Sequence, residues 1–267
     1  MGPTSSAYSI TEDDRRQVKT HAGLQRALTL HGLGFRTEAV REWNWSVRGA
    51  DDRLLLAAAE AANEAGWYDR AIYAADRTKR LHNYSLRYLA PYREVTRGYA
   101  LELGLDEAWV YGLIRQESRF VTSARSSVGA GGLMQVMPAT AQWVANRIGL
   151  KYHAGMMNEV GTNVQLGTYY MKHVLDSLSN QPVLATAGYN AGPNRARAWQ
   201  PADASMEAPI YVESIPFLET RDYVKKVMAN AVAYSMTFGE KRLALTTRLG
   251  VIPPRNAPVP EEPVQTT

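Results

Sequence analysis

The chain has no cysteine among its 267 residues. This absence excludes disulfide bonds, thiolate metal sites and a cysteine nucleophile. It does not identify the compartment, because a chain without cysteine is stable in either redox environment. The length is enough for one large domain or two modest ones, and a chain of this size can bury a core that needs no covalent cross-links.

Long apolar runs and long basic runs are also missing. No stretch is long enough to span a bilayer, and the first six residues lack the basic and apolar regions of a signal peptide. The formal net charge of +4 favours anionic partners such as a carboxylate-rich cell wall, although an ordinary soluble surface also carries such a surplus. Because the basic residues form no stripe and no nucleic-acid motif is present, we expect no nucleic-acid binding.

The sequence also lacks histidines at the spacing of a metal site. The five histidines, at positions 21, 31, 82, 153 and 173, do not cluster with other potential ligands. We therefore expect neither a metal ion nor another cofactor.

No segment shows the sustained two-residue alternation of a strand, so the predicted fold class is all-α. Residues 8–90 are predicted to form helical hairpins, because residues 24–43 superimpose on residues 56–75 with an offset of 32 residues. Gly34 and Gly66 fall at equivalent positions, where a tight turn joins two helices. This offset is typical of stacked helix pairs; the alternative is ordinary helices that match by coincidence.

A second region is predicted to begin near Pro91, because proline disfavours helix at the residue before it. Residues 91–245 contain further helical patterns. Residues 246–267 are predicted to be a disordered tail, since residues 251–267 carry five prolines and few groups that could pack.

Glu117 is the first candidate for catalysis. It ends a predicted helix that begins after Asp106, and that helix carries Val110, Leu113 and Ile114 on the same face. Burial on this face raises the pKa of a carboxyl, and the negative end of the helix dipole acts in the same direction. A carboxyl that stays protonated near neutral pH suits a general acid for glycosidic cleavage. The alternative is a solvated carboxylate at a helix boundary.

Two further segments could line a binding site. Residues 126–137 contain three glycines within four positions, which allow a ligand to approach the backbone, and Gln135, whose amide suits sugar hydroxyls. Tyr189 follows a predicted helix and could donate a hydrogen bond from a flat, partly apolar ring. The alternatives are core packing before the helix that starts at Pro138 and an ordinary helix end.

Together these segments resemble the motifs of lytic transglycosylases with a lysozyme-like fold. Four motifs in the same order are more specific than any one of them. The motifs are QESRF at 116–120, GLMQ at 132–135, YNAG at 189–192 and VESIPFLETR at 212–221, with NVQLGTYY at 163–170 fitting a helix of the family. The fourth motif resembles the soluble lytic murein transglycosylase branch, and residues 8–90 resemble the end of that branch's superhelical region.

The resemblance implies a lysozyme-like catalytic domain in which Glu117 is the single catalytic acid and base. The residues that it implies for the glycan groove are Ser126, Gln135, Met137, Tyr189, Asn190 and Glu219. It implies peptidoglycan glycan strands as the partner, association with cell-wall enzyme complexes, and a location in the periplasm or the cell envelope.

The resemblance also implies a reaction without water. Most glycosidases use two carboxyl groups, whereas the first motif supplies one. In the implied reaction, Glu117 protonates the oxygen between MurNAc and GlcNAc, and the C6 hydroxyl of the same MurNAc then closes a 1,6-anhydro ring. The first alternative is a goose-type lysozyme-like hydrolase that uses water. The second is an inactive glycan-binding or interaction protein, which the intact Glu117 argues against.

Overall fold

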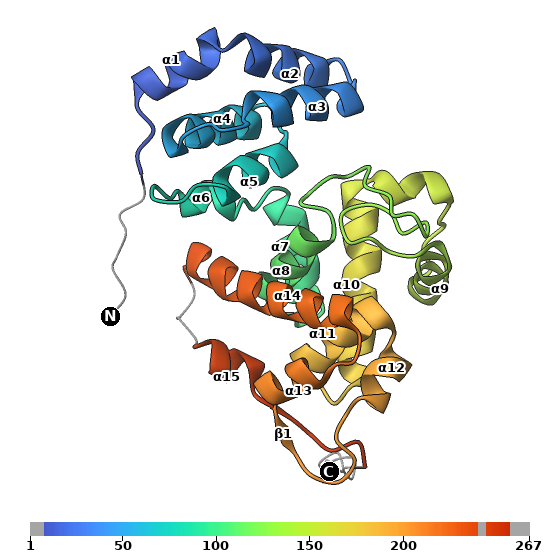
Figure 1. The fold of residues 1–267 in the computed structure, drawn as a ribbon. Coiled ribbons are helices and arrows are strands. Elements are labelled where there is room, and N and C mark those ends of the chain that lie inside the picture. Colours follow the sequence, from blue (N-terminus) through green and yellow to red (C-terminus); the bar gives the residue numbers. More distant parts are fainter. Residues whose placement is uncertain (1–7, 240–243, 257–267) are drawn as a thin grey trace.

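The computed structural model describes residues 8–239 and 244–256, and this part of the chain is mostly helical (Figure 1). The predicted all-α class is confirmed. The helices of the first region are α1 (Glu12–Thr20), α2 (Ala22–Gly32), α3 (Arg36–Ser46), α4 (Asp52–Glu64), α5 (Tyr68–Asp76) and α6 (Tyr84–Arg87).

The second region also consists mainly of helices, and most residues of its helix α8 are buried. Its elements are α7 (Arg93–Glu102), α8 (Glu107–Glu117), α9 (Pro138–Ile148), η1 (Ala154–Asn158), α10 (Val160–Ser177), α11 (Pro182–Ala191), α12 (Pro193–Ala198), β1 (Met206–Glu207), α13 (Ala208–Ser214), α14 (Leu218–Thr237), α15 (Leu245–Leu249) and β2 (Val251–Ile252). The two strands pair antiparallel and form a sheet of two residues each.

The first region is a stack of helical hairpins, as predicted. The turns between α2 and α3 and between α4 and α5 contain Gly34 at φ 83° and Gly66 at φ 68°, a conformation that side chains with a Cβ rarely adopt. Small side chains let the helices approach closely. The buried alanines are Ala27, Ala39, Ala57, Ala58, Ala59, Ala62, Ala71, Ala74 and Ala75.

Helix α8 packs directly against α14 in the second region (Figure 1). A Cβ atom at Gly112 would lie 2.7 Å from the carbonyl oxygen of Val227 and 2.9 Å from the backbone nitrogen of Ala231. The absence of a side chain therefore lets the two backbones touch. This contact fixes the end of α8 relative to the side chains of α14.

The C-terminal part of the described chain packs on the second region. Ile252 is fully buried and pairs with Met206, and the Gln181 amide donates to the carbonyl of Leu249 over 2.7 Å. The prediction of a disordered tail from residue 246 is therefore wrong for residues 246–256, because buried apolar groups and strand pairing hold them in place. Residues 257–267 of that predicted tail lie outside the described residues.

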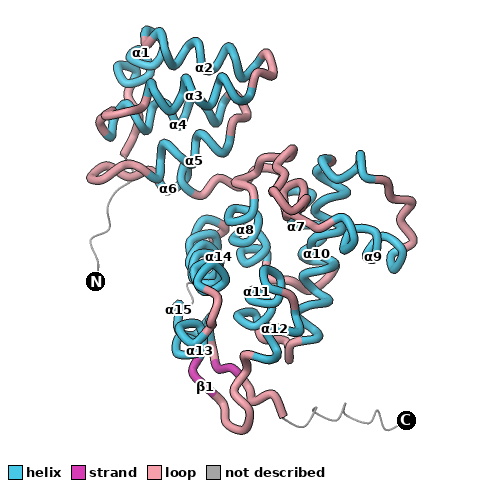
Figure 2. The backbone as a smooth tube through the Cα atoms, turned by 45° about the vertical axis from the view of Figure 1, so that its right-hand side comes forward, coloured by secondary structure: helices cyan, strands magenta, loops and turns pink. Residues whose placement is uncertain are grey.

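The two regions lie end to end and meet around α6, α8 and α14 (Figure 2). The predicted junction is held by the second region, since the Tyr111 hydroxyl donates to the carbonyl of Pro91 over 2.9 Å and the Tyr234 hydroxyl donates to that of Leu89 over 2.8 Å. Each region has its own cluster of buried apolar residues, although Ile72 of α5 belongs to the cluster of the second region.

Candidate active site

Glu117 is the last residue of α8. The helix begins as predicted at Asp106, whose carboxylate accepts a hydrogen bond from the backbone N–H of Trp109. Val110, Leu113 and Ile114 are all buried. The preceding turns of the helix are therefore enclosed, and Glu117 emerges from them only partly exposed.

The surroundings of the Glu117 carboxyl favour its protonated form more than water does. Burial raises its pKa from 4.5 to about 7, against the effect of one hydrogen bond that the Tyr223 hydroxyl donates to Oε1 over 2.5 Å. The direction predicted from the apolar face of α8 is confirmed. A carboxyl in this range can both give and take a proton near neutral pH.

Tyr223 was not among the residues predicted from the sequence. It lies on α14, one helical turn after Glu219, and no local pattern in the sequence pairs it with Glu117. Burial raises the pKa of the Tyr223 hydroxyl well above its usual value, and the nearby Glu117 adds to this. The hydroxyl therefore stays protonated and acts as a donor to Glu117.

Tyr189 lies at the end of α11, close to the same carboxyl. Its hydroxyl donates to the carbonyl of Met134 over 2.8 Å, so it connects α11 to the glycine-rich loop. Burial raises the pKa of Tyr189 well above its usual value, with a further contribution from Glu117. The predicted binding residue Tyr189 is thus beside the acid, with its hydroxyl already engaged by the backbone.

The predicted binding residues Ser126 and Gln135 support the glycine-rich loop from within. Ser126 Oγ accepts from the backbone N–H of Ala130 over 3.0 Å. Gln135 adopts φ 47°, and its Nε2 donates to the carbonyls of Ala124 and Gly132 over 3.1 and 2.8 Å. Both side chains therefore shape the loop.

Asn163 is a second residue whose role sequence reasoning missed, although it opens the motif noticed at 163–170. It is fully buried, accepts from the backbone N–H of Met134 over 2.8 Å, and donates to the carbonyls of Gly131 and Met157, both over 3.0 Å. A Cβ atom at Gly132 would lie 2.2 Å from its Nδ2. The loop therefore needs glycine at 132 because the amide of Asn163 fills that space.

Ser118 connects the first two motifs. Its Oγ donates to the carbonyl of Leu133 over 2.8 Å and accepts from the N–H of Phe120 over 3.1 Å. This bridge fixes the loop next to the carboxyl of Glu117.

The remaining predicted binding residues lie at the surface around this centre. Asn190 accepts from the Thr220 hydroxyl over 2.7 Å, which joins the end of α11 to the start of α14. Asn190, Glu219 and Met137 are exposed, with Met137 at 40%. None of these three, nor Ser126, lines the cavity at Glu117, whereas Gln135 does.

A cavity of about 520 Å³ opens beside Glu117. Both regions of the chain line it. Its residues are Arg36, Asp69, Arg70, Gln116, Glu117, Ser118, Arg119, Val121, Ser123, Ala124, Arg125 and Gln135. The second carboxyl group, Asp69, accepts hydrogen bonds from Arg36 and Arg70 over 3.0 and 3.1 Å. Asp69 is therefore paired with two guanidinium groups, whereas burial raises the pKa of Glu117.

A larger cavity, of about 700 Å³, lies in the first region near Asp52. The Asp52 carboxylate accepts hydrogen bonds from the backbone N–H groups of Lys79, Arg80 and Leu81. Burial alone would raise the pKa of this carboxyl, but these donors lower it. An ionised carboxylate that closes a turn has a structural role, so the smaller cavity is the candidate site.

Within residues 8–239 and 244–256, no three histidine or carboxylate side chains group as metal ligands. None of the helices in this part of the chain has the length and apolar character needed to cross a membrane.

The all-α fold is lysozyme-like, and it holds one protonatable carboxyl at the end of a buried helix, beside a glycine-rich loop. Three family descriptions match the chain: "Transglycosylase SLT domain" at residues 94–211, "Soluble lytic transglycosylase helical domain" at 214–242 and "Soluble lytic murein transglycosylase L domain" at 17–83. The chain belongs to the soluble lytic transglycosylase family.

Relatives and solved structures agree with this assignment. The chain is 32% identical to soluble lytic murein transglycosylases of Salmonella typhimurium and Escherichia coli, over 91% and 90% of its own length and 40% and 39% of theirs. An inactive mutant of the lytic transglycosylase Slt from Pseudomonas aeruginosa matches with a TM-score of 0.81 at 32% identity, over 88% of this chain and 39% of that one.

The 70 kDa soluble lytic transglycosylase from Escherichia coli matches with a TM-score of 0.78 at 26% identity, over 92% of this chain and 40% of that one. A structure of the 70 kDa enzyme in complex with bulgecin A also matches. The chain thus spans about 40% of the length of the relatives that it matches.

Proposed function

We propose that the chain is a peptidoglycan lytic transglycosylase that cleaves the bond between MurNAc and GlcNAc and leaves a 1,6-anhydro-MurNAc end. The observation that carries this proposal is the carboxyl of Glu117, whose pKa burial raises to about 7 in a cavity where the other carboxyl is paired with arginines. Family membership supports the identity of the bond.

The reaction uses Glu117 twice. In the first step, the protonated carboxyl gives its proton to the glycosidic oxygen, and the bond from that oxygen to C1 of MurNAc breaks. In the second step, the Glu117 carboxylate removes the proton from the C6 hydroxyl of the same MurNAc, and that oxygen forms a bond to C1. The tethered hydroxyl competes well with water because its effective concentration is high. The hydrogen bond from Tyr223 stabilises the carboxylate between the two steps.

The hydrolase alternative uses the same acid with a water molecule in place of the C6 hydroxyl. The alternative of an inactive glycan-binding protein leaves the raised pKa of Glu117 without a purpose, because burying a carboxyl with one hydrogen bond costs stability. The hydrolase predicts products with a reducing end, and the inactive binding protein predicts no products.

We further propose a division of labour between the two regions. Residues 91–245 would form the catalytic unit, which the packing of residues 246–256 extends, and residues 8–90 would form a docking platform. Peptidoglycan strands are the proposed partner and the periplasm is the proposed location, where association with other cell-wall enzymes would follow from a shared substrate.

Mass spectrometry of the products released from purified sacculi tests the proposal. The expected muropeptides end in anhydro-MurNAc and are lighter by one water than those of a hydrolase. The Glu117→Gln variant serves as the control for contaminating activity. Products with a reducing end would establish the hydrolase, and an absence of products from the folded wild-type chain would leave only the binding function.

A further inference from the structure

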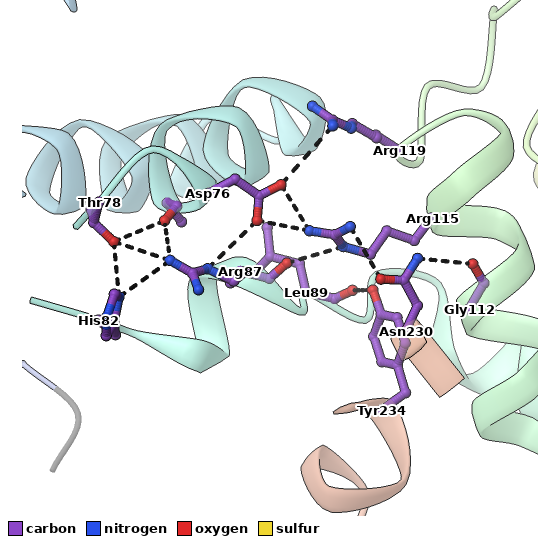
Figure 3. Close-up of polar contacts among 11 residues, drawn as sticks. Asp76, Thr78, His82, Arg87, Leu89, Gly112, Arg115, Arg119, Asn230 and Tyr234 are labelled. Atoms are coloured by element: carbon purple, nitrogen blue, oxygen red, sulfur yellow. Dashed lines mark hydrogen bonds and ion pairs between the residues drawn. The ribbon is translucent and has the colours of Figure 1, made fainter. Parts of the chain in front are cut away.

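Asp76, the last residue of α5, lies between the two regions and joins the arginines on either side of the acid (Figure 3). The Nη2 atom of Arg115 donates to both carboxylate oxygens of Asp76 over 2.9 Å, and the guanidinium of Arg119 lies 4.0 Å from the same carboxylate. Arg115 precedes Glu117 by two residues, and Arg119 follows it by two. One carboxylate of the first region therefore holds the chain immediately before the acid and approaches it immediately after.

The guanidinium of Arg115 is fixed by three helices. The side chain is only 10% exposed. Besides its contact with Asp76 of α5, its Nε atom donates to the carbonyl of Arg87, at the end of α6, over 3.3 Å. Its Nη1 atom donates to the side-chain oxygen of Asn230 on α14 over 3.3 Å. Every nitrogen of this group thus has an acceptor, and two of the three acceptors belong to the first region.

Asn230 extends the same set of contacts along α14 to the partner of the acid. Its Nδ2 atom donates to the carbonyl of Gly112 on α8 over 3.4 Å. Tyr223, which donates to Glu117, lies seven residues earlier on α14, and residues seven apart share one face of a helix. The face of α14 that contacts Arg115 is therefore the face that presents the single donor to the acid.

Net stability is a poor explanation for this group of charges. Arg87 brings a third guanidinium to 3.5 Å from Asp76, so three positive charges share one negative charge. Burial lowers the pKa of Arg119, and the charge of Arg115 lowers it further, against the effect of Asp76. An ion pair with little exposure contributes little net stability, because desolvation offsets the attraction between the charges. The group is better explained by the orientation that it imposes on the end of α8.

We propose that Asp76 is a positioning residue for Glu117, through which the first region sets the placement of the acid by way of Arg115. The first region thus contributes to turnover as well as to docking. This inference rests on the proposed function, in which Glu117 is the acid that cleaves the glycan. A reacting group that is misplaced by about 1 Å can lower a rate by about 10²-fold, so a small displacement of the end of α8 is enough to be measured.

Loss of the Asp76 charge should act on kcat rather than on KM. In the described part of the chain, the lining of the cavity at Glu117 does not include Asp76, so Asp76→Asn removes no contact to a substrate bound there. It leaves Arg115 buried without its anion, and the end of α8 can then shift. For cleavage of soluble, uncrosslinked glycan strands, we expect kcat to fall about tenfold and KM to stay within about twofold of wild type.

A double variant separates placement from stability. Asp76→Asn alone leaves an uncompensated guanidinium, which should lower the urea midpoint. Asp76→Asn combined with Arg115→Gln restores the net charge of the group, so it should recover most of the midpoint and still keep the low kcat, because the first region no longer holds α8. Glu60→Gln is the matched control. Glu60 pairs with Arg15 over 2.7 Å inside the first region, and its side chain is 23% exposed, against 30% for Asp76.

The control should lose some stability and keep the kcat of wild type. A kcat of the double variant within about twofold of wild type would overturn the proposal, because the ion pair would then matter only through stability. An equal loss of kcat in Glu60→Gln would overturn it too, as would a change in Asp76→Asn that is confined to KM. Failure of the proposed function has a different signature, since it appears in the wild-type products. Products with a reducing end would replace the transglycosylase by a hydrolase and leave the comparison of rates valid, whereas no cleavage by the wild-type chain would overturn both proposals.

Discussion

Two buried carboxyl groups, one in each region, have pKa values that are shifted in opposite directions. Asp14 of α1 has no exposed surface, and burial would raise its pKa, but hydrogen bonds from Thr11, Tyr8 and Arg53 hold the pKa far below its usual value. Glu117 of α8 has a single donor, Tyr223, and burial raises its pKa to about 7. The difference lies in the number of donors, since burial acts in the same direction on both.

This contrast separates a structural carboxylate from one suited to catalysis. The Thr11, Tyr8 and Arg53 donors make the ionised form of Asp14 part of the fold of the first region. The second region leaves Glu117 short of donors, which costs stability when the group ionises and keeps a proton available. Burial by itself therefore does not identify an acid; the count of donors does.

The largest effect expected is on cleavage by Glu117→Gln. Loss of the general acid should lower the rate of anhydro-product release by at least 10²-fold, while the circular dichroism spectrum stays unchanged. Glu219→Gln is the control, since its carboxylate is exposed on α14, and it should lose less than tenfold. A comparable loss in both variants would show that two carboxyl groups share the chemistry, as in ordinary glycosidases.

The pH dependence of stability should be the next largest effect. A raised pKa means that the folded chain binds the proton of Glu117 more tightly than the unfolded chain does, so its contribution is fully present below pH 4.5 and is lost as the pH rises to about 7. Relative to wild type, Glu117→Gln should gain stability across this range, by at most about 3 kcal/mol, and then stay level. Urea unfolding at several pH values measures it; a variant less stable at high pH would mean a paired carboxylate.

Asp14→Asn should show the opposite sign. The amide cannot replace the charge that Arg53 and the Thr11 and Tyr8 donors surround, so we expect a loss of about 2 kcal/mol at neutral pH. Because the pKa of Asp14 is lowered, this contribution is present above pH 3.8 and is lost as the pH falls below it. Asp13→Asn, exposed on the same helix, is the control and should change the urea midpoint little. Equal midpoints for the two variants would contradict the role of Asp14.

Local features could be predicted from the sequence, and contacts between distant segments could not. The helix that ends at Glu117 followed from its apolar spacing, and the hairpins followed from the glycines at 34 and 66. Tyr223 lies 106 residues from Glu117, and nothing near either residue specifies the pairing. The burial of Ile252 was missed for the same reason, because its partner strand is at Met206.

The lining of the cavity at Glu117 also depends on contacts between distant segments, which could not be predicted from the sequence. Arg36 and Asp69 reach the site of Glu117 only because the first region stacks on the second, an arrangement set by the junction near Pro91. The motifs place the acid on its helix, but they do not say which arginines surround it. Whether the division at residue 91 marks independent folding units stays a prediction.

The smallest expected effect comes from removing the hydroxyl of Tyr223, the single hydrogen-bond donor to Glu117. Tyr223→Phe removes the one hydrogen bond that lowers the pKa of Glu117, so that pKa should rise above about 7. Since Glu117 must be protonated to act as the acid, the basic limb of the pH profile of kcat/KM should move to higher pH. Tyr189→Phe is the matched control, because its hydroxyl donates to Met134 instead, and it should leave the limb nearly in place. A limb that moves to lower pH in Tyr223→Phe would mean that the hydroxyl favours the protonated acid. In that case the donor count would no longer explain why Glu117 and Asp14 differ.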